Sequence, residues 1–115
     1  MMAGERPYDV LIVGELNVDL IVSGDVEPAF GQVEKIVDDL TICAGSSGGI
    51  FAAGCAKMGL SVLFVSVVGD DAFGRFMLAA LRQAGVDTSR VRVDAQLKTG
   101  ASLILSKQGD RAILT

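Results

Sequence analysis

The most restrictive feature of this sequence is an apolar run followed directly by an amphipathic helix pattern. The run is Val62–Val68, and the turn Gly69-Asp70-Asp71 separates it from the helix. The apolar stripe of the helix recurs every three or four residues and comprises Phe73, Phe76, Met77, Ala80, Leu81 and Ala84. Burying such large side chains stabilises a fold by about 1.5–3 kcal/mol each, so this helix must dock on a sheet. One of the two aspartates is expected to cap its start, and Gly85 to end it.

The rest of the chain carries further strand and helix patterns. Val10–Val13 is a continuous apolar run before a glycine, which predicts a fully buried strand. Asn17–Ser23 alternates, with Val18, Leu20 and Val22 on one face, and predicts a half-buried strand. Further expected elements are an extended ribbon over 33–42, a helix from about Ser47 to Gly59, and short strands over 90–93, 101–106 and 111–114. This order predicts an α/β sheet with a β appendage.

The composition suits this class of fold. The 115 residues are enough for one domain, and half of them are hydrophobic while only 5% are aromatic. The core must therefore be aliphatic, as in parallel sheets covered by helices on both faces. The expected helix after Ser46 contains Gly54, which costs roughly 1 kcal/mol relative to alanine in a helix interior. Tight packing against a neighbour is the expected reason for that glycine.

Charge and residue usage exclude several classes of function. The net charge of −4 and the pI of about 4.6 argue against a nucleic-acid partner. The chain has no histidine, which removes histidine bases, histidine zinc ligands and a Ser-His-Asp triad within these residues. Cys43 and Cys55 lie among apolar residues and are expected to be reduced, buried thiols. With no signal peptide at 1–7 and no membrane-spanning run, the sequence predicts a soluble cytoplasmic protein.

Two polar residues lie on the predicted strand over 17–23. Asn17 and Asp19 are two positions apart, so their side chains point to the same side of that strand. Aspartate offers hydrogen-bond acceptors and asparagine offers both a donor and an acceptor, so the pair can hold neighbouring hydroxyl groups. On spacing alone, a solvated strand face or a turn cap is the favoured explanation of the pair.

A glycine-rich loop, Gly45-Ser46-Ser47-Gly48-Gly49, leads into the first expected helix. Glycines let a backbone approach a ligand, and a helix start presents free N–H groups. The spacing matches neither a dinucleotide fingerprint nor a Walker-type phosphate loop. A flexible turn with small-residue helix packing explains the loop as well as a ligand site does. Asp70 and Asp71 are adjacent, but one is needed as a helix cap and no further ligands lie nearby, so we expect a structural role and no metal site.

Taken in order, these segments resemble the PfkB, or ribokinase-like, carbohydrate kinase family. The resemblance spans about Asp9 to Thr115, nearly the whole chain. Its motifs are Gly14-Glu15-Leu16-Asn17-Val18-Asp19, Gly45-Ser46-Ser47-Gly48-Gly49, Lys57-Met58-Gly59, Val68-Gly69-Asp70-Asp71-Ala72-Phe73-Gly74, Ala84-Gly85-Val86-Asp87-Thr88-Ser89 and Thr99-Gly100-Ala101. Each motif is weak alone, and the shared order makes the set specific.

The resemblance implies a fold and a substrate site. The fold would be α/β, a ribokinase-like partial Rossmann-like sheet with a small β-sheet lid formed by segments at about 17–23 and 34–42. Family members transfer the γ-phosphoryl group of ATP, with a divalent cation such as Mg²⁺, to a sugar or similar alcohol. The positions carried over as substrate-binding are Asn17, Asp19, Gly45 and Ser46. In many members the lid also forms a dimer contact, which implies a homodimer here.

The sequence departs from the family in two respects, the residues of the glycine-rich loop and the helix start that follows it, and a missing late motif. Ser46 stands where the family loop commonly has a second glycine, and Ile50 stands at an asparagine that contacts the substrate. Ile50 cannot hydrogen-bond a hydroxyl group, so the expected substrate either lacks a hydroxyl at that point or is a different alcohol such as a nucleoside. The family's late D-x-x-G-A-G-D type motif, which holds the catalytic aspartate and the anion hole, does not occur in these residues.

These departures define the leading hypothesis and its alternatives. Residues 1–115 are expected to be the amino-terminal part of a ribokinase-like domain, without the nucleotide-binding and catalytic part, inactive alone and binding no cofactor alone. The end of the chain at Thr115, inside an apolar strand-like run, also favours a fragment. One alternative is a non-catalytic sugar-binding or dimerisation module of the same fold. The other is an unrelated α/β domain, in which Asn17 and Asp19 would face away from the Gly45 loop.

Overall fold

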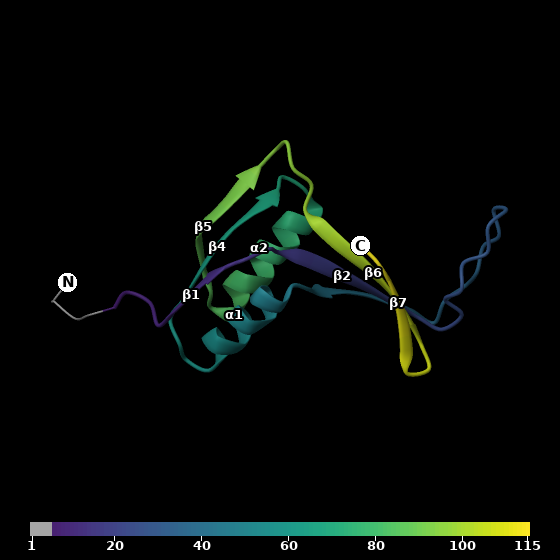
Figure 1. The fold of residues 1–115 in the computed structure, drawn as a ribbon, viewed down its shortest axis with the longest axis horizontal. Helices are drawn as coiled ribbons and strands as arrows, with labels where there is room; N and C mark the ends of the chain where they lie inside the picture. Colours follow the sequence, from purple (N-terminus) through teal and green to yellow (C-terminus); the bar gives the residue numbers. More distant parts are fainter. Residues whose placement is uncertain (1–5) are drawn as a thin grey trace.

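Residues 6–115 are described by the structure, a computed structural model in which two sheets and two helices form an elongated molecule (Figure 1). The first sheet is entirely parallel, with the order β1-β4-β5. Its strands are β1 (Val10–Val13), β4 (Val62–Gly69) and β5 (Asp87–Asp94), and its helices are α1 (Ser47–Lys57) and α2 (Ala72–Ala84). The expected α/β class is confirmed. The sequence-based statement about residues 1–7 lies mostly outside the described residues.

The second sheet, which we call the lid, has the order β3-β2-β6-β7. Its strands are β2 (Asn17–Ser23), β3 (Asp39–Ala44), β6 (Gly100–Lys107) and β7 (Asp110–Leu114). β2 pairs antiparallel with β3 and parallel with β6, and β6 pairs antiparallel with β7. The last pair closes through Gln108 and Gly109, which both have positive φ, as a tight hairpin turn requires. Figure 1 shows the lid extending away from the helices.

The ribbon expected over 33–42 is wrong at its start, because β3 begins only at Asp39. The register explains why β3 does not begin earlier. β2 ends at Ser23, which pairs with Asp39, so the residues before Asp39 have no β2 residue to pair with. The intervening chain forms a loop that projects from the lid at the far right of Figure 1. Phe30 in this loop is 99% exposed.

The core lies between the helices and one face of the parallel sheet. Val62, Phe64 and Val68 of β4 alternate toward the helices and are buried. They pack with Ala52 of α1, with Met77, Leu78 and Leu81 of α2, and with Leu16, Val18 and Val86. This aliphatic core with a single buried phenylalanine matches the composition.

The prediction that β1 is fully buried is wrong. Val10 and Ile12 pack against the core, but Leu11 is 62% exposed and Val13 is 74% exposed. The physical reason is that α1 and α2 both cover the same face of the sheet, whereas the composition favoured helices on both faces. In the described residues, the side of the sheet that carries Leu11, Val13 and Val67 has no helix against it.

The helix expected after the aspartate turn is confirmed in detail. Asp71 is the N-cap of α2, and its side chain accepts a hydrogen bond from the Gly74 amide. Gly85 ends the helix in the left-handed conformation, with φ of 96°. The apolar stripe faces the core, while Arg75 and Arg82 are exposed as expected.

The small residues of α1 have a different role from the one expected for Gly54. Close packing occurs at the start of the helix, where a Cβ atom at Gly48 would contact Phe64 and one at Gly49 would contact Leu16 and Met77. A Cβ atom at Gly54 would meet nothing within 4 Å, so the prediction that Gly54 allows tight packing is wrong. Gly54 therefore lowers helix stability without a packing contact that explains it.

Cys43 and Cys55 are free thiols, as predicted, but they are half-buried rather than buried. Neither helix in the described part of the chain has the length and apolar character to cross a membrane.

Candidate functional site

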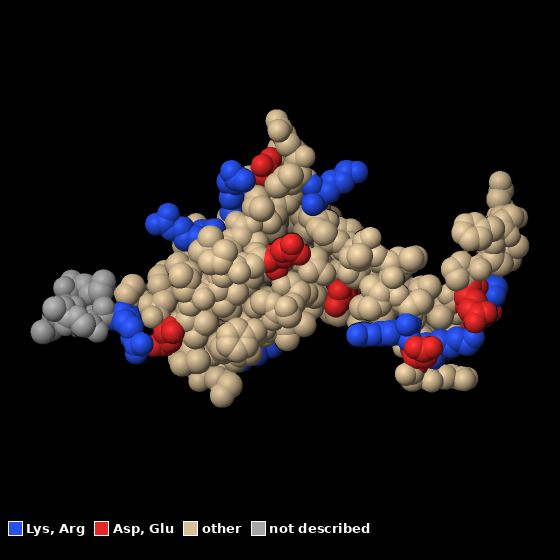
Figure 2. All heavy atoms as spheres, viewed as in Figure 1, with Lys and Arg blue, Asp and Glu red and all other residues tan. Residues whose placement is uncertain are grey.

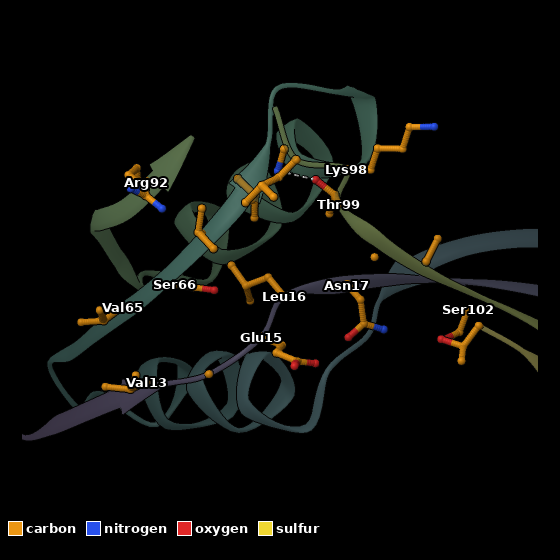
Figure 3. Close-up of a pocket in the computed structure, with 18 residues that line it drawn as sticks. Val13, Glu15, Leu16, Asn17, Val65, Ser66, Arg92, Lys98, Thr99 and Ser102 are labelled. Carbon is orange, nitrogen blue, oxygen red and sulfur yellow. Dashed lines mark hydrogen bonds between the residues drawn. The ribbon is translucent and has the colours of Figure 1, made fainter. Parts of the chain in front are cut away.

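The candidate site lies where the parallel sheet meets the lid. The chain passes between the two sheets three times: from β1 to β2 through Gly14–Leu16, from β3 into α1 through Gly45 and Ser46, and from β5 to β6 through residues 95–99. An open cleft of about 890 Å³ lies at this junction (Figure 3). Its polar lining comprises Glu15, Asn17, Ser66, Arg92, Lys98, Thr99, Ser102 and Thr115. A second hollow of about 400 Å³ is lined by Glu15, Asn17, Ser46 and their neighbours.

Asn17 and Asp19 are the first two residues that the sequence singled out, and they lie beside the Gly45 loop. Asn17 lines both hollows, and Figure 3 shows its side chain with that of Glu15 beside the start of α1. Asp19 lines neither hollow, but its carboxylate lies against Gly45. The alternative of an unrelated domain, with this pair facing away from the loop, is therefore wrong.

Position 45 requires glycine because the backbone there lies directly against Asn17 and Asp19. Its amide donates a 2.9 Å hydrogen bond to the Asn17 carbonyl oxygen. A Cβ atom at position 45 would lie 2.6 Å from Asp19 Oδ1 and 2.9 Å from the Asn17 carbonyl oxygen. Only glycine leaves both groups in place, so the loop and the pair Asn17 and Asp19 form one unit.

Ser46 has a structural task in addition to its place in the loop. Its hydroxyl accepts a 3.1 Å hydrogen bond from the Gly49 amide, which caps α1, and donates to the Glu15 carbonyl oxygen. Its φ of 72° and ψ of 126° are a combination that favours glycine, at a cost of roughly 1–3 kcal/mol for other residues. The cap contributes about 1 kcal/mol, so it offsets part of that strain.

Charge is distributed unevenly around the site. On the face shown in Figure 2, basic side chains lie mainly toward the rim, and acidic side chains lie both near the middle and beside the basic ones at the rim. Arg92 and Lys98 line the outer part of the cleft, and Arg92 has Asp94 3.8 Å away. This surface offers no continuous basic track for a polyanion, in line with the net charge of −4.

Comparison with known proteins identifies the family. The sequence model described as pfkB family carbohydrate kinase matches residues 8–115. The chain belongs to this family. It is 28% identical over 106 residues to a ribokinase of Bacillus subtilis, covering 92% of this chain and 36% of the relative.

Solved structures agree with this pfkB assignment. A PfkB protein from a Polaromonas species superimposes with a TM-score of 0.78 at 28% identity, covering 92% of this chain and 34% of that one. A fructokinase with bound ATP from Xylella fastidiosa gives a TM-score of 0.76 at 25% identity, covering 93% and 32%. The fold is therefore ribokinase-like, and the chain spans about a third of the length of these relatives.

The structure places the two residues, Ser46 and Ile50, that differ from the pfkB pattern in and just after the glycine-rich loop. Ser46, at the family's second glycine, has the positive φ that a glycine would adopt without strain. Ile50, at the family's asparagine, lies in the first turn of α1 and is 58% exposed. Ile50 lines neither hollow at the junction, so it does not compensate for the missing amide.

Several residues at the junction were not singled out from the sequence. Glu15, Ser66, Lys98 and Ser102 line the large cleft. Ser102 lies next to Asp19 because the two residues are partners in the β2–β6 register. Strand alternation alone cannot reveal that proximity, since it depends on a parallel pairing between distant segments.

In the described residues, the carboxylates near the two helix starts do not form a site that fits a triphosphate or a divalent cation. They contain no group of three potential metal-ligating residues, Asp70 pairs with Arg75 at 3.1 Å, and Asp71 caps α2. The Thr99 and Gly74 amides hold the pKa of Asp71 below its usual range. A carboxylate thus occupies the start of α2, and Glu15 lies in the hollow at the start of α1, where either would repel a triphosphate.

Proposed function

We propose that this chain is the amino-terminal, substrate-binding portion of an ATP-dependent carbohydrate kinase, and that it does not transfer a phosphoryl group alone. The substrate class is a sugar or a nucleoside. The observation that carries the proposal is the meeting of Asn17, Asp19 and the Gly45 backbone at the junction of the two sheets. A cytoplasmic location belongs to the same proposal, and the two free thiols support it.

The chemistry of the site supports a polyhydroxylated substrate. Asp19 provides acceptors for hydroxyl donors, and the Asn17 amide can donate and accept. Ser46 contributes by holding Glu15 and α1 in place, through hydrogen bonds to both. The family's D-x-x-G-A-G-D type motif does not occur in these 115 residues. Phosphoryl transfer depends on positioning and charge stabilisation, so we expect binding without turnover.

Binding without turnover can be measured on the purified chain. We expect pentoses, hexoses and nucleosides to include at least one ligand that shifts the backbone amide resonances of Asn17, Asp19 and Gly45. With that ligand, ATP and Mg²⁺, no ADP should be released above the ligand-free rate. Resonances unchanged by every ligand would contradict the binding proposal, and ligand-dependent ADP release would contradict the proposed inactivity.

A pair of aspartate variants gives the matched control for this experiment. Asp19→Ala is expected to weaken ligand binding by about tenfold to a hundredfold, because hydrogen bonds to a charged group contribute about 1.5–3 kcal/mol. Asp25→Ala removes an exposed carboxylate beyond the end of β2 that pairs with Lys35, and should leave the affinity unchanged. Equal ligand affinities for the two variants would contradict a role for Asp19 in binding.

A second candidate function is association through the lid. Leu40 and Ile42 of β3 are 62% and 42% exposed on an edge strand, and Ile36 in the preceding loop is 95% exposed. Exposed apolar side chains along an unpaired strand edge favour pairing with another chain. This observation supports a homodimer formed through the lid, with or without a sugar-binding role.

Sedimentation equilibrium at micromolar concentrations tests this association. We expect a dimer whose dissociation constant rises at least about tenfold in Leu40→Lys, since a buried charge without a partner is costly. Leu11→Lys is the matched control, because Leu11 is also 62% exposed but lies on the open side of the parallel sheet. A monomeric wild-type chain, or a larger effect of Leu11→Lys, would contradict association through the lid.

A further inference from the structure

One cluster at the sheet junction is not explained by the proposed binding residues. It consists of Gly69, Asp71, Gly74 and Thr99, and we call it the latch. Gly69 ends β4, Asp71 and Gly74 form the start of α2, and Thr99 directly precedes β6. The latch therefore joins the helical part of the molecule to the central strands of the lid.

The contacts of the latch use both oxygens of one carboxylate. Asp71 Oδ1 accepts a 2.7 Å hydrogen bond from the Gly74 amide, and Oδ2 accepts a 2.8 Å hydrogen bond from the Thr99 amide. The Thr99 hydroxyl accepts a 2.9 Å hydrogen bond from the Gly69 amide. Thr99 is only 8% exposed, so its hydroxyl bond is buried, and the two bonds to Asp71 are part-buried. Lost hydrogen bonds in such surroundings cost more than those at a free surface.

The two glycines of the latch leave no room for a side chain. A Cβ atom at Gly69 would lie 2.6 Å from Asp71 Oδ2 and 2.8 Å from the Thr99 amide nitrogen. One at Gly74 would overlap the Gly69 carbonyl oxygen and lie 2.9 Å from Thr99 Oγ1. The backbone of the β5–β6 connection is thus held directly against the start of α2.

The latch is connected to Asn17 through one residue. Gly100 follows Thr99 and is the register partner of Asn17 in the parallel β2–β6 pair. A Cβ atom at Gly100 would lie 3.4 Å from the Asn17 Cβ atom, so the two residues are close to contact. A shift of Thr99 therefore moves the backbone against which Asn17 packs.

We propose that Asp71 is a positioning residue, which holds Thr99 and Gly100 so that Asn17 keeps its place at the cleft. This inference rests on the proposed function only where it says that the position of Asn17 matters for a substrate. The role needs aspartate in particular, because the shorter serine side chain can cap a helix equally well but carries a single oxygen. The lowered pKa of Asp71, caused first by the Thr99 amide, agrees with a carboxylate that accepts both bonds.

The test separates the cap from the latch with Asp71→Ser, measured without any ligand. The serine is expected to keep the Gly74 bond, so amides in α2 retain their protection from hydrogen exchange. The Thr99 amide should exchange about tenfold to a hundredfold faster, and the resonances of Asn17 and Gly100 should shift. Asp70→Ser is the matched control, since Asp70 contacts Arg75 and not Thr99. If Asp71→Ser keeps the wild-type exchange rate of the Thr99 amide and the wild-type resonances of Asn17, the proposal is overturned.

A second pair of variants tests the latch independently, in case Asp71→Ser fails to fold. Thr99→Val removes the hydroxyl that accepts from the Gly69 amide, and Thr99→Ser keeps it. We expect the Asn17 resonances to shift in Thr99→Val and to return toward wild type in Thr99→Ser. Equal shifts in both variants would contradict the latch. Because these readouts need no sugar, a failure of the latch is distinct from a failure of the wild-type chain to bind any ligand.

Discussion

Phe64→Ala is expected to lower the free energy of unfolding by about 3–5 kcal/mol, which is the usual cost of removing a buried phenylalanine. Phe64 is completely buried in β4. Its ring lies against two glycines that line the second hollow, since Cβ atoms at Gly14 and Gly48 would contact it at 3.8 Å and 3.5 Å. A domain of this kind is typically stable by about 5–15 kcal/mol, so the variant would lose a large share of its stability.

Urea unfolding followed by far-ultraviolet circular dichroism measures this loss at constant temperature. Phe30→Ala is the matched control because Phe30 is 99% exposed, and its effect should stay within about 0.5 kcal/mol. Similar losses for the two variants would mean that Phe64 does not form the centre of the core.

Gly74→Ala and Gly54→Ala are expected to change stability in opposite directions although both glycines lie in helices. At Gly74 the added methyl group would overlap the Gly69 carbonyl oxygen, and such overpacking typically costs about 1–3 kcal/mol. At Gly54 nothing lies within 4 Å, so the higher helix propensity of alanine should add about 0.5–1 kcal/mol.

The same urea titrations give both values, and each variant serves as the control for the other. A stabilised Gly74→Ala chain would contradict the close contact between β4, α2 and the latch. A destabilised Gly54→Ala chain would mean that Gly54 contacts a neighbour after all, as the sequence alone suggested.

Local patterns were sufficient to predict the parts of the fold that depend on neighbouring residues. The α2 helix, its cap at Asp71 and its end at Gly85 follow from side-chain spacing and cap chemistry within one segment. The shared side of Asn17 and Asp19 follows from strand alternation alone. The family resemblance assigned substrate binding to Asn17, Asp19, Gly45 and Ser46. The structure places Asp19 against Gly45 and Asn17 beside Ser46, and substrate binding by these residues stays a prediction.

Features that depend on distant partners were missed or predicted wrongly. The burial of β1 depends on which faces the helices cover, and an apolar run such as Val10–Val13 does not carry that information. The start of β3 is set by the end of its partner strand. The hydrogen bond from the Thr99 amide to Asp71 Oδ2 joins positions 28 residues apart. The sequence therefore predicted the helix cap but not the partner of this second carboxylate oxygen. Ser102 was missed for the same reason.

The parallel pairing of β2 with β6 has a consequence for how the chain folds. Asn17 pairs with Gly100, so residues 24–99, most of the described chain, lie between the two central strands of the lid. Contacts of such long sequence separation form slowly, because the entropy of closing the intervening loop must be overcome first. The helices and the parallel sheet bring the two strands close and shorten that search. We therefore expect the lid to assemble after the core, and slow core formation to leave the edge of β2 that pairs with β6 unpaired for longer.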